Sequence, residues 1–434
     1  MTTHHPHRLH QPRRRNRLAV GAVSLISAAA ITACAPAARP ATTAEPLHAP
    51  DAVDGGGAAE VARPARAIAV VDERGAVTLI DLATEERSVI AAAGSAVQTV
   101  DGSGRYLFLA RTHAAETSVL IVDSGRWTQP HGDHSHYFHR EARVVGEISG
   151  AGHAAVVVGA DAVAITFDGS EMVALRYEEL ASQGTDAATR VAADGAELSV
   201  VVGDELVRAV HGVVDVPGQE SVPCAGVRDV DTTRAGTVFT CADAAVIVSR
   251  EVGGALSVGA VPFAPSDGTL PGGEAAASPR STVSVSDDPV AGIAPPAEAL
   301  AGRGDRPDLA APAGDLGVWR LDVRAGAWTL LESDAPLVRA AALGDDAHRT
   351  VAIDAAGALR VLAEDGEVIA RTEPLVAAAL ADPRTRDRVA LVLDSSHAYV
   401  SDPEAGAIHE VELDTGIVSR TFDAPDPRFL ELVG

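Results

Sequence analysis

The chain has 434 residues, a formal net charge of −25 and only 3% aromatic residues. A surface this acidic repels nucleic acid and anionic lipid head groups, so the composition argues against proteins that bind either through a basic face. The length is ample for one large β domain, and the scarcity of aromatic side chains argues against a groove that stacks sugars.

The first 33 residues are typical of a bacterial lipoprotein signal peptide. An arginine-rich polar head, residues 1–17, is followed by the apolar run Leu18–Ala33 and then by Cys34. The run is shorter than the ~20 residues of a comfortable membrane span. Because small residues precede Cys34, the segment resembles a lipobox, which implies that Cys34 becomes the lipidated first residue. An ordinary signal peptide with an incidental cysteine is the alternative, and Arg14-Arg15 leaves the twin-arginine export route open.

Two segments are too poor in large apolar residues to be expected to fold. Residues 34–65 are rich in Ala, Pro, Thr and Gly, and we expect them to form a disordered tether behind the lipid anchor. Residues from about 264 to 313 have a similar composition with scattered acids, which predicts a disordered insertion in a surface loop. The folded domain is then expected to cover residues 66–434.

Residues 66–434 consist of short β-branched runs separated by tight turns. The first pair, Ile68–Asp72 and Ala76–Asp81, is joined by a turn that contains Gly75. Asp and Gly at such turns tolerate left-handed backbone angles. Several neighbouring turns recur at about 35–40 residues, the interval of a four-stranded propeller blade. No long helical period appears, so the sequence predicts an all-β fold, a seven- or eight-bladed β-propeller.

Two cysteines remain after Cys34, namely Cys224 and Cys241. An even pair in an exported protein is expected to form a disulfide. A reactive thiol or a thiolate metal ligand is the alternative.

The densest group of chemically active side chains is rich in histidine. Four histidines and one aspartate fall within nine positions: His131, Asp133, His134, His136 and His139. Imidazole and carboxylate together suit zinc, and His134 and His136 at i, i+2 lie on one face of a strand. His153, at the start of the next strand, is placed to complete a site. The alternative is a solvated polar loop between blades.

We expect no enzymatic activity, because the sequence contains no nucleophile elbow, no phosphate-binding loop and no HExxH motif.

The histidine segment also resembles a known family. Residues 127–146, with His-Gly-Asp-His-Ser-His-Tyr at 131–137, are similar to the AztD zinc metallochaperones, as are residues 224–243 and 398–410. The resemblance implies a β-propeller that hands zinc to an ABC-transporter solute-binding protein outside the cytoplasm. It carries over His131, His134 and His136 as motif histidines, together with His153. Two positions depart from the family pattern: no histidine follows shortly after Cys224, where the chain continues to Asp229 without one, and the low-complexity insertion replaces a histidine-bearing stretch expected before Trp319.

The sequence therefore predicts an extracytoplasmic, lipid-anchored zinc-binding accessory protein that supplies zinc to an ABC-type uptake system. It would contact the membrane only through the lipid on Cys34 and would bind no nucleic acid. The alternative function is a cell-surface propeller that serves as a scaffold for protein–protein interaction, with no functional metal.

Overall fold

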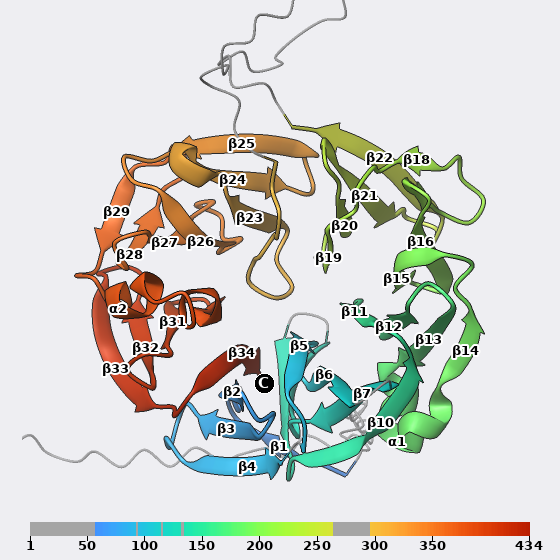
Figure 1. The fold of residues 1–434 in the computed structure, drawn as a ribbon, viewed down its shortest axis with the longest axis horizontal. Helices are drawn as coiled ribbons and strands as arrows, with labels where there is room; N and C mark the ends of the chain where they lie inside the picture. The colour runs from blue at the N-terminus through green and yellow to red at the C-terminus, as the bar shows by residue number, and fades with distance from the viewer. Residues whose placement is uncertain (1–56, 93, 114–115, 132–133, 264–295) are drawn as a thin grey trace, which may run out of the picture. The chain divides into compact units, whose positions relative to one another are not determined.

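The structure is a computed structural model that describes residues 57–92, 94–113, 116–131, 134–263 and 296–434. The expected signal peptide, Cys34 and Asp133 lie outside the described residues. In this part of the chain, eight antiparallel sheets follow one another around a ring, as Figure 1 shows. Seven of these sheets have four strands and one has three. The predicted all-β propeller is confirmed, and the described residues form eight blades.

The elements follow the chain from blade to blade. Blades one and two contain β2 (Ala67–Asp72), β3 (Val77–Asp81), β4 (Arg87–Ala91), β5 (Val97–Gly102), β6 (Tyr106–His113), β7 (Glu116–Asp123) and β10 (Arg143–Ala151). Blades three to five contain β11 (Ala154–Val158), β12 (Ala162–Phe167), β13 (Glu171–Arg176), β14 (Thr189–Ala192), β15 (Ala196–Val202), β16 (Glu205–Val210), β17 (Val213–Asp215), β18 (Val222–Pro223), β19 (Asp229–Thr232), β20 (Thr237–Thr240), β21 (Ala244–Arg250) and β22 (Leu256–Pro262). Blades six to eight contain β23 (Asp308–Pro312), β24 (Gly317–Asp322), β25 (Ala327–Glu332), β26 (Leu337–Ala342), β27 (Thr350–Asp354), β28 (Leu359–Leu362), β29 (Val368–Arg371), β30 (Leu391–Leu393), β31 (His397–Asp402), β32 (Ala407–Glu412) and β33 (Ile417–Asp423).

Helices are few and short in the described residues. They are α1 (Tyr177–Gln183), α2 (Ala377–Ala381) and three 3-10 turns at Gly184–Ala187, Gly314–Leu316 and Arg386–Arg388. No helix in the described part of the chain is long and apolar enough to cross a membrane.

The ring is closed by the two ends of the folded chain. The last strand, β34 (Pro427–Val433), pairs antiparallel with β2, with Val433 opposite Ala67. The first blade therefore combines the C-terminal strand with three strands from the beginning of the domain. This pairing joins the end of the folded chain to its beginning within one sheet, which closes the ring.

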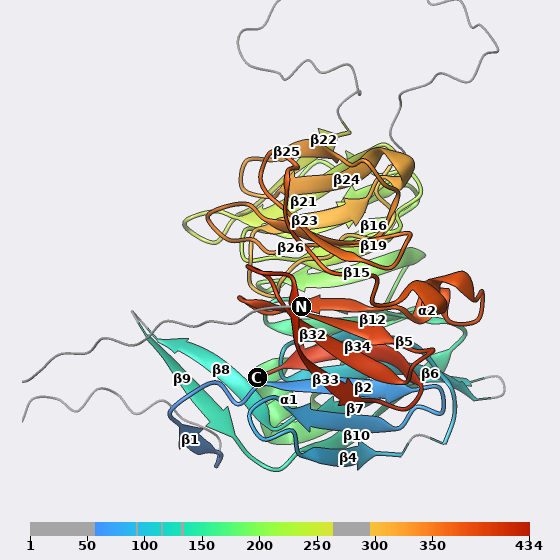
Figure 2. The same cartoon turned by 90° about the vertical axis from the view of Figure 1, so that its left-hand side faces the viewer.

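The second blade carries an extra hairpin that positions the histidine cluster. The chain leaves β7, forms β8 (Arg126–His131) and β9 (His134–His139), and only then returns as β10 to pair with β7. β8 and β9 join β1 (Ala59–Val61) in a separate three-stranded sheet. Figure 2 shows the two strands reaching out beyond the blades, with β1 beside them. The histidine hairpin, residues 126–139, is therefore set apart from the blade that supports it.

The structure differs from the sequence expectations at two boundaries. Strand β1 lies within residues 34–65, which composition assigns to a disordered tether. Residues 296–313, assigned to the disordered insertion, include β23 and the buried Ala297 and Leu300. The few apolar side chains of this second segment pack in a cluster with Trp319 and Trp328. Their burial depends on aromatic residues from other strands, which a local composition count cannot register.

The expected disulfide is present. Cys224 follows β18 in the fourth blade, Cys241 follows β20 in the fifth, and their sulfur atoms lie 2.04 Å apart. The bond is buried beside Phe239 and Val246. A cross-link that closes a loop of 17 residues stabilises the fold by about 3 kcal/mol in chain-entropy terms. Because disulfides persist in oxidising compartments, the bond favours an extracytoplasmic location.

Candidate metal centre

The histidine hairpin brings three of the candidate ligands together. In the β8–β9 register, His131 lies directly opposite His134, and His136 lies two residues further along β9. Residues paired across a ladder share a face, as do residues at i and i+2 on one strand, so the three imidazoles share one face. Their ligand nitrogens all lie within 4.8 Å of one another. His131 and His134 are exposed and His136 is half-buried.

The spacing within this cluster suits a small metal ion. His134 Nε2 and His136 Nε2 are 3.0 Å apart. Zinc–nitrogen bonds of about 2.0–2.1 Å at tetrahedral angles separate two ligand atoms by about 3.3 Å. The His131 ring lies 5.4 Å from the His134 ring and 5.5 Å from the His136 ring, measured between centroids. For His134 and His136, a shift of a few tenths of an ångström would bring the two nitrogens to this separation.

A carboxylate outside the motif fixes the orientation of one ligand. Glu60, on β1, lies with Oε1 2.7 Å from His136 Nδ1. An ionised carboxylate only accepts hydrogen bonds, so Nδ1 donates, and in the neutral ring the lone pair is then on Nε2. His136 Nε2 therefore presents its lone pair to the cluster. Hydrogen bonds from ligand imidazoles to carboxylates are a regular feature of zinc sites because they fix the tautomer and raise ligand basicity.

The base of the hairpin is held by a buried carboxylate. Asp123, at the end of β7, is fully buried and accepts hydrogen bonds from Arg105, Arg140 and the Gly125 N–H. The Arg105 guanidinium also lies 3.8 Å from the centre of the Trp127 ring, at the start of the hairpin. Burial alone would raise the pKa of Asp123, but the hydrogen bonds from Arg105 and Arg140 outweigh it and hold this pKa below its ordinary value.

An aromatic pair continues from this base toward the histidines. Trp127 on β8 stacks on Phe138 on β9 with ring centroids 5.2 Å apart. The ring of His136 lies 6.4 Å from that of Phe138 on the same face. Arg126 adds a tie to the first blade through a 2.7 Å ion pair with Asp81. The hairpin is therefore held on the cluster's face by the Trp127–Phe138 stack and on the other face by the ion pair of Arg126 with Asp81.

Two of the sequence candidates are placed elsewhere. His139 pairs with Arg126 in the ladder and has the opposite parity to His136, so it lies on the other face of the hairpin. Partial burial, followed by the charge of Arg126, lowers the pKa of His139. His153 is exposed just before β11. Neither belongs to a group of metal-ligand atoms among the described residues. Asp133 lies outside the described residues and stays a sequence-based expectation.

Sequence reasoning missed Glu60. It lies in a segment of low complexity and is 76 residues from His136. Only the pairing of β1 with β9 brings it to the cluster, with Glu60 opposite Phe138. An isolated acid among small residues gives no local signal of such a contact.

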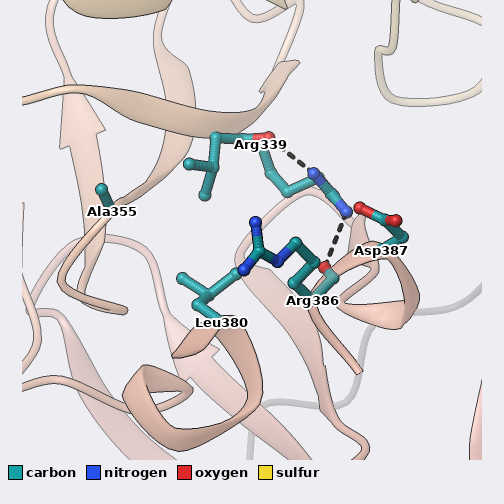
Figure 3. Close-up of a pocket in the computed structure, with 6 residues that line it drawn as sticks. Arg339, Ala355, Leu380, Arg386 and Asp387 are labelled. Atoms are coloured by element: carbon teal, nitrogen blue, oxygen red, sulfur yellow. Dashed lines mark hydrogen bonds between the residues drawn. The ribbon is translucent and has the colours of Figure 1, made fainter. Parts of the chain in front are cut away.

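A cavity between the seventh and eighth blades is a weaker candidate. It has a volume of about 420 Å³, and Figure 3 shows the residues that line it, among them Arg339, Leu380 and Asp387. The Arg339 guanidinium donates to the carbonyls of Val338, Arg386 and Val389. This arginine therefore satisfies backbone acceptors, and its role is to join the two blades.

The fold and the hairpin together define a β-propeller with a projecting histidine cluster. Among the solved structures with this fold are apo AztD from Citrobacter koseri and AztD from Citrobacter koseri. Each superposes with a TM-score of 0.65, at 16% and 17% sequence identity, over 85% of this chain and 97% of the other. No family model and no curated protein matches the sequence. The chain is thus an AztD-like β-propeller in fold, as the motif resemblance predicted.

Proposed function

We propose that this protein is an extracytoplasmic zinc-binding accessory protein that supplies zinc to an ABC-type uptake system. The observation that carries the proposal is the cluster of His131, His134 and His136, with Glu60 hydrogen-bonded to one of its rings. Three imidazoles with one position left for a further ligand are a common donor set for zinc. The resemblance to AztD, described above, supports zinc as the metal.

The position of the cluster favours delivery over catalysis. Two of its three histidines are exposed, and the hairpin that holds them projects from the second blade. A partner protein can therefore approach the metal and exchange ligands with it. Glu60 is engaged with His136, so it is not placed as a free general base for a metal-bound water.

The alternative function, a propeller scaffold without metal, uses the same projecting hairpin as a protein-binding surface. The two proposals differ in whether the histidines bind zinc. A zinc measurement on the purified domain therefore separates them.

Removing two of the three ligands should abolish zinc binding at the hairpin. We expect His134→Ala/His136→Ala to bind one equivalent of zinc less than the wild-type chain in a calorimetric titration. Glu60→Gln, which keeps the shape but not the charge, should weaken this binding by about 10–100-fold. Acidification should also weaken it, because protons compete for the imidazole nitrogens.

His139→Ala and His153→Ala are the matched controls, since both remove a histidine outside the cluster. Each should leave the zinc stoichiometry unchanged. Equal binding by the wild type and the double variant would place the zinc site elsewhere, and no binding by the wild type would favour the scaffold.

Zinc-loaded protein should also transfer its metal to a metal-free zinc solute-binding protein faster than to a small chelator that only captures released ions.

We also propose that Cys34 anchors the protein to the membrane through a lipid. The proposal is supported by the lipobox-like segment that ends at Cys34 and by the disulfide, which favours export. Cys34→Ala should move the protein from the membrane fraction to the soluble fraction, or leave it as an unprocessed precursor. Processed, membrane-bound Cys34→Ala protein would show that the anchor lies elsewhere.

A further inference from the structure

A second group of potential ligands lies between the sixth and seventh blades. Asp308 is the first residue of β23 and lies directly opposite Asp322, the last residue of β24. His348 reaches them from the loop between β26 and β27. One ligand atom from each of the three lies within 4.8 Å of the other two. The group is far in sequence from the histidine hairpin, and none of its members stands in a recognisable motif.

The two carboxylates are poorly compensated by the protein. Like charges directly opposite each other in a β ladder destabilise it. Asp308 is only 1% exposed, and its Oδ1 is buried without a hydrogen-bond partner in the described part of the chain. Among the described residues, no arginine lies within ion-pair distance of Asp308 or Asp322. His348 Nδ1 lies 2.8 Å from Asp308 Oδ2, and Asp322 Oδ1 accepts a hydrogen bond from the Ala325 N–H. Even a protonated His348 would leave one negative charge unbalanced.

The backbone holds His348 in an uncommon conformation toward this pair. Its φ of 47° lies in the left-handed region, which is unfavourable for a residue with a side chain. The His348 N–H donates to the Asp345 carbonyl at 3.0 Å, and its carbonyl accepts from Arg320 at 2.9 Å. These bonds fix the loop so that the imidazole meets the Asp308 carboxylate.

We propose that Asp308, Asp322 and His348 form a second divalent-metal site, one that joins the sixth and seventh blades. Two carboxylates and an imidazole suit zinc or manganese, and their charges neutralise a divalent ion. A bound ion would supply the missing partner for Asp308 Oδ1 and remove the repulsion between the two aspartates. The hairpin cluster, by contrast, offers neutral ligands at an exposed position. The second site should therefore retain its metal while the hairpin exchanges it, and it does not depend on the hairpin's function.

The test uses the mature full chain in which the hairpin ligands are already removed, His131→Ala/His134→Ala/His136→Ala. Zinc titration into this variant should still show one bound equivalent and a zinc-dependent rise in the melting temperature. Adding His348→Asn should weaken this remaining binding by more than about 100-fold, since a ligand is lost rather than a supporting group. Asparagine is chosen because it tolerates a positive φ. Asp308→Asn, which is isosteric, should have the same effect.

His211→Asn is the matched control, because His211 is a histidine with a φ of 51° in an exposed turn. It should change neither the stoichiometry nor the zinc-dependent melting shift. If the site is only a structural ion pair, His348→Asn will lower the melting temperature equally with and without zinc, which would overturn the proposal. The proposal is also overturned if the triple hairpin variant binds no zinc. If only the proposed hairpin site is wrong, His134→Ala/His136→Ala will bind as many equivalents of zinc as the wild type.

Discussion

Replacing Asp123 by alanine is expected to lower the free energy of unfolding by about 3–5 kcal/mol, the range for breaking a buried ion pair. The substitution leaves Arg105 and Arg140, both largely buried, without their shared carboxylate. It also removes the acceptor for the Gly125 N–H at the point where the hairpin begins. The free energy of unfolding should fall, and the backbone of residues 126–139 should become less well ordered.

Chemical denaturation measures the first effect and hydrogen exchange of the amides in residues 126–139 measures the second. The contribution of Asp123 should be complete above about pH 4 and be lost as the pH falls through its lowered pKa, because the unfolded state binds the proton at a higher pH than the ion-paired folded state does. Asp204→Ala is the matched control, since Asp204 pairs with Arg176 at 86% side-chain exposure and should contribute less than about 1 kcal/mol. Similar losses for the two variants would contradict the assigned role of Asp123.

Stability should decline as the pH rises from about 4 to about 8, because carboxylates gather on the innermost strands. Asp101 on β5, Asp229 and Asp231 on β19 and Glu431 on β34 are all half-buried. Burial, followed by repulsion from Asp229, raises the pKa of Asp101 to about 7. Burial, followed by repulsion from Asp101, raises the pKa of Glu431 to about 8. The pKa of Asp231 is also raised, first by burial and then by its acidic neighbours.

The direction follows from proton linkage. Between the ordinary carboxyl pKa near 4 and these raised values, the folded state holds more protons than the unfolded state, so rising pH favours unfolding. Asp101→Asn and Glu431→Gln should therefore each stabilise the protein by roughly 1–3 kcal/mol at pH 8 and have little effect at pH 4. Urea denaturation across this range checks the result, with the exposed Glu220→Gln as a control. A wild-type stability that rises toward pH 8 would show that the central carboxylates are not mutually destabilising.

The hairpins and the all-β class were predictable from the sequence, because alternation and turn chemistry are local properties. The Ile68–Asp72 run and its partner across Gly75 appear in the structure as β2 and β3 with little change. The i, i+2 spacing of His134 and His136 likewise places both side chains on one face of a strand once the strand exists. The two cysteines could be paired from their number alone.

The composition of each metal-ligand group was decided only by the tertiary structure. The register of β8 against β9 places His131 on the face of His134 and His136, and a shift of one residue would move it to the other face, beside His139. Glu60 reaches His136 through strand pairing, and His348 reaches Asp308 from a different blade. Such contacts join residues 40 to 76 positions apart, so they depend on how strands and blades pack together. Local sequence patterns determine which residues of a strand share a face. Which distant residues contact that face depends on how the strands and blades pack in the closed ring.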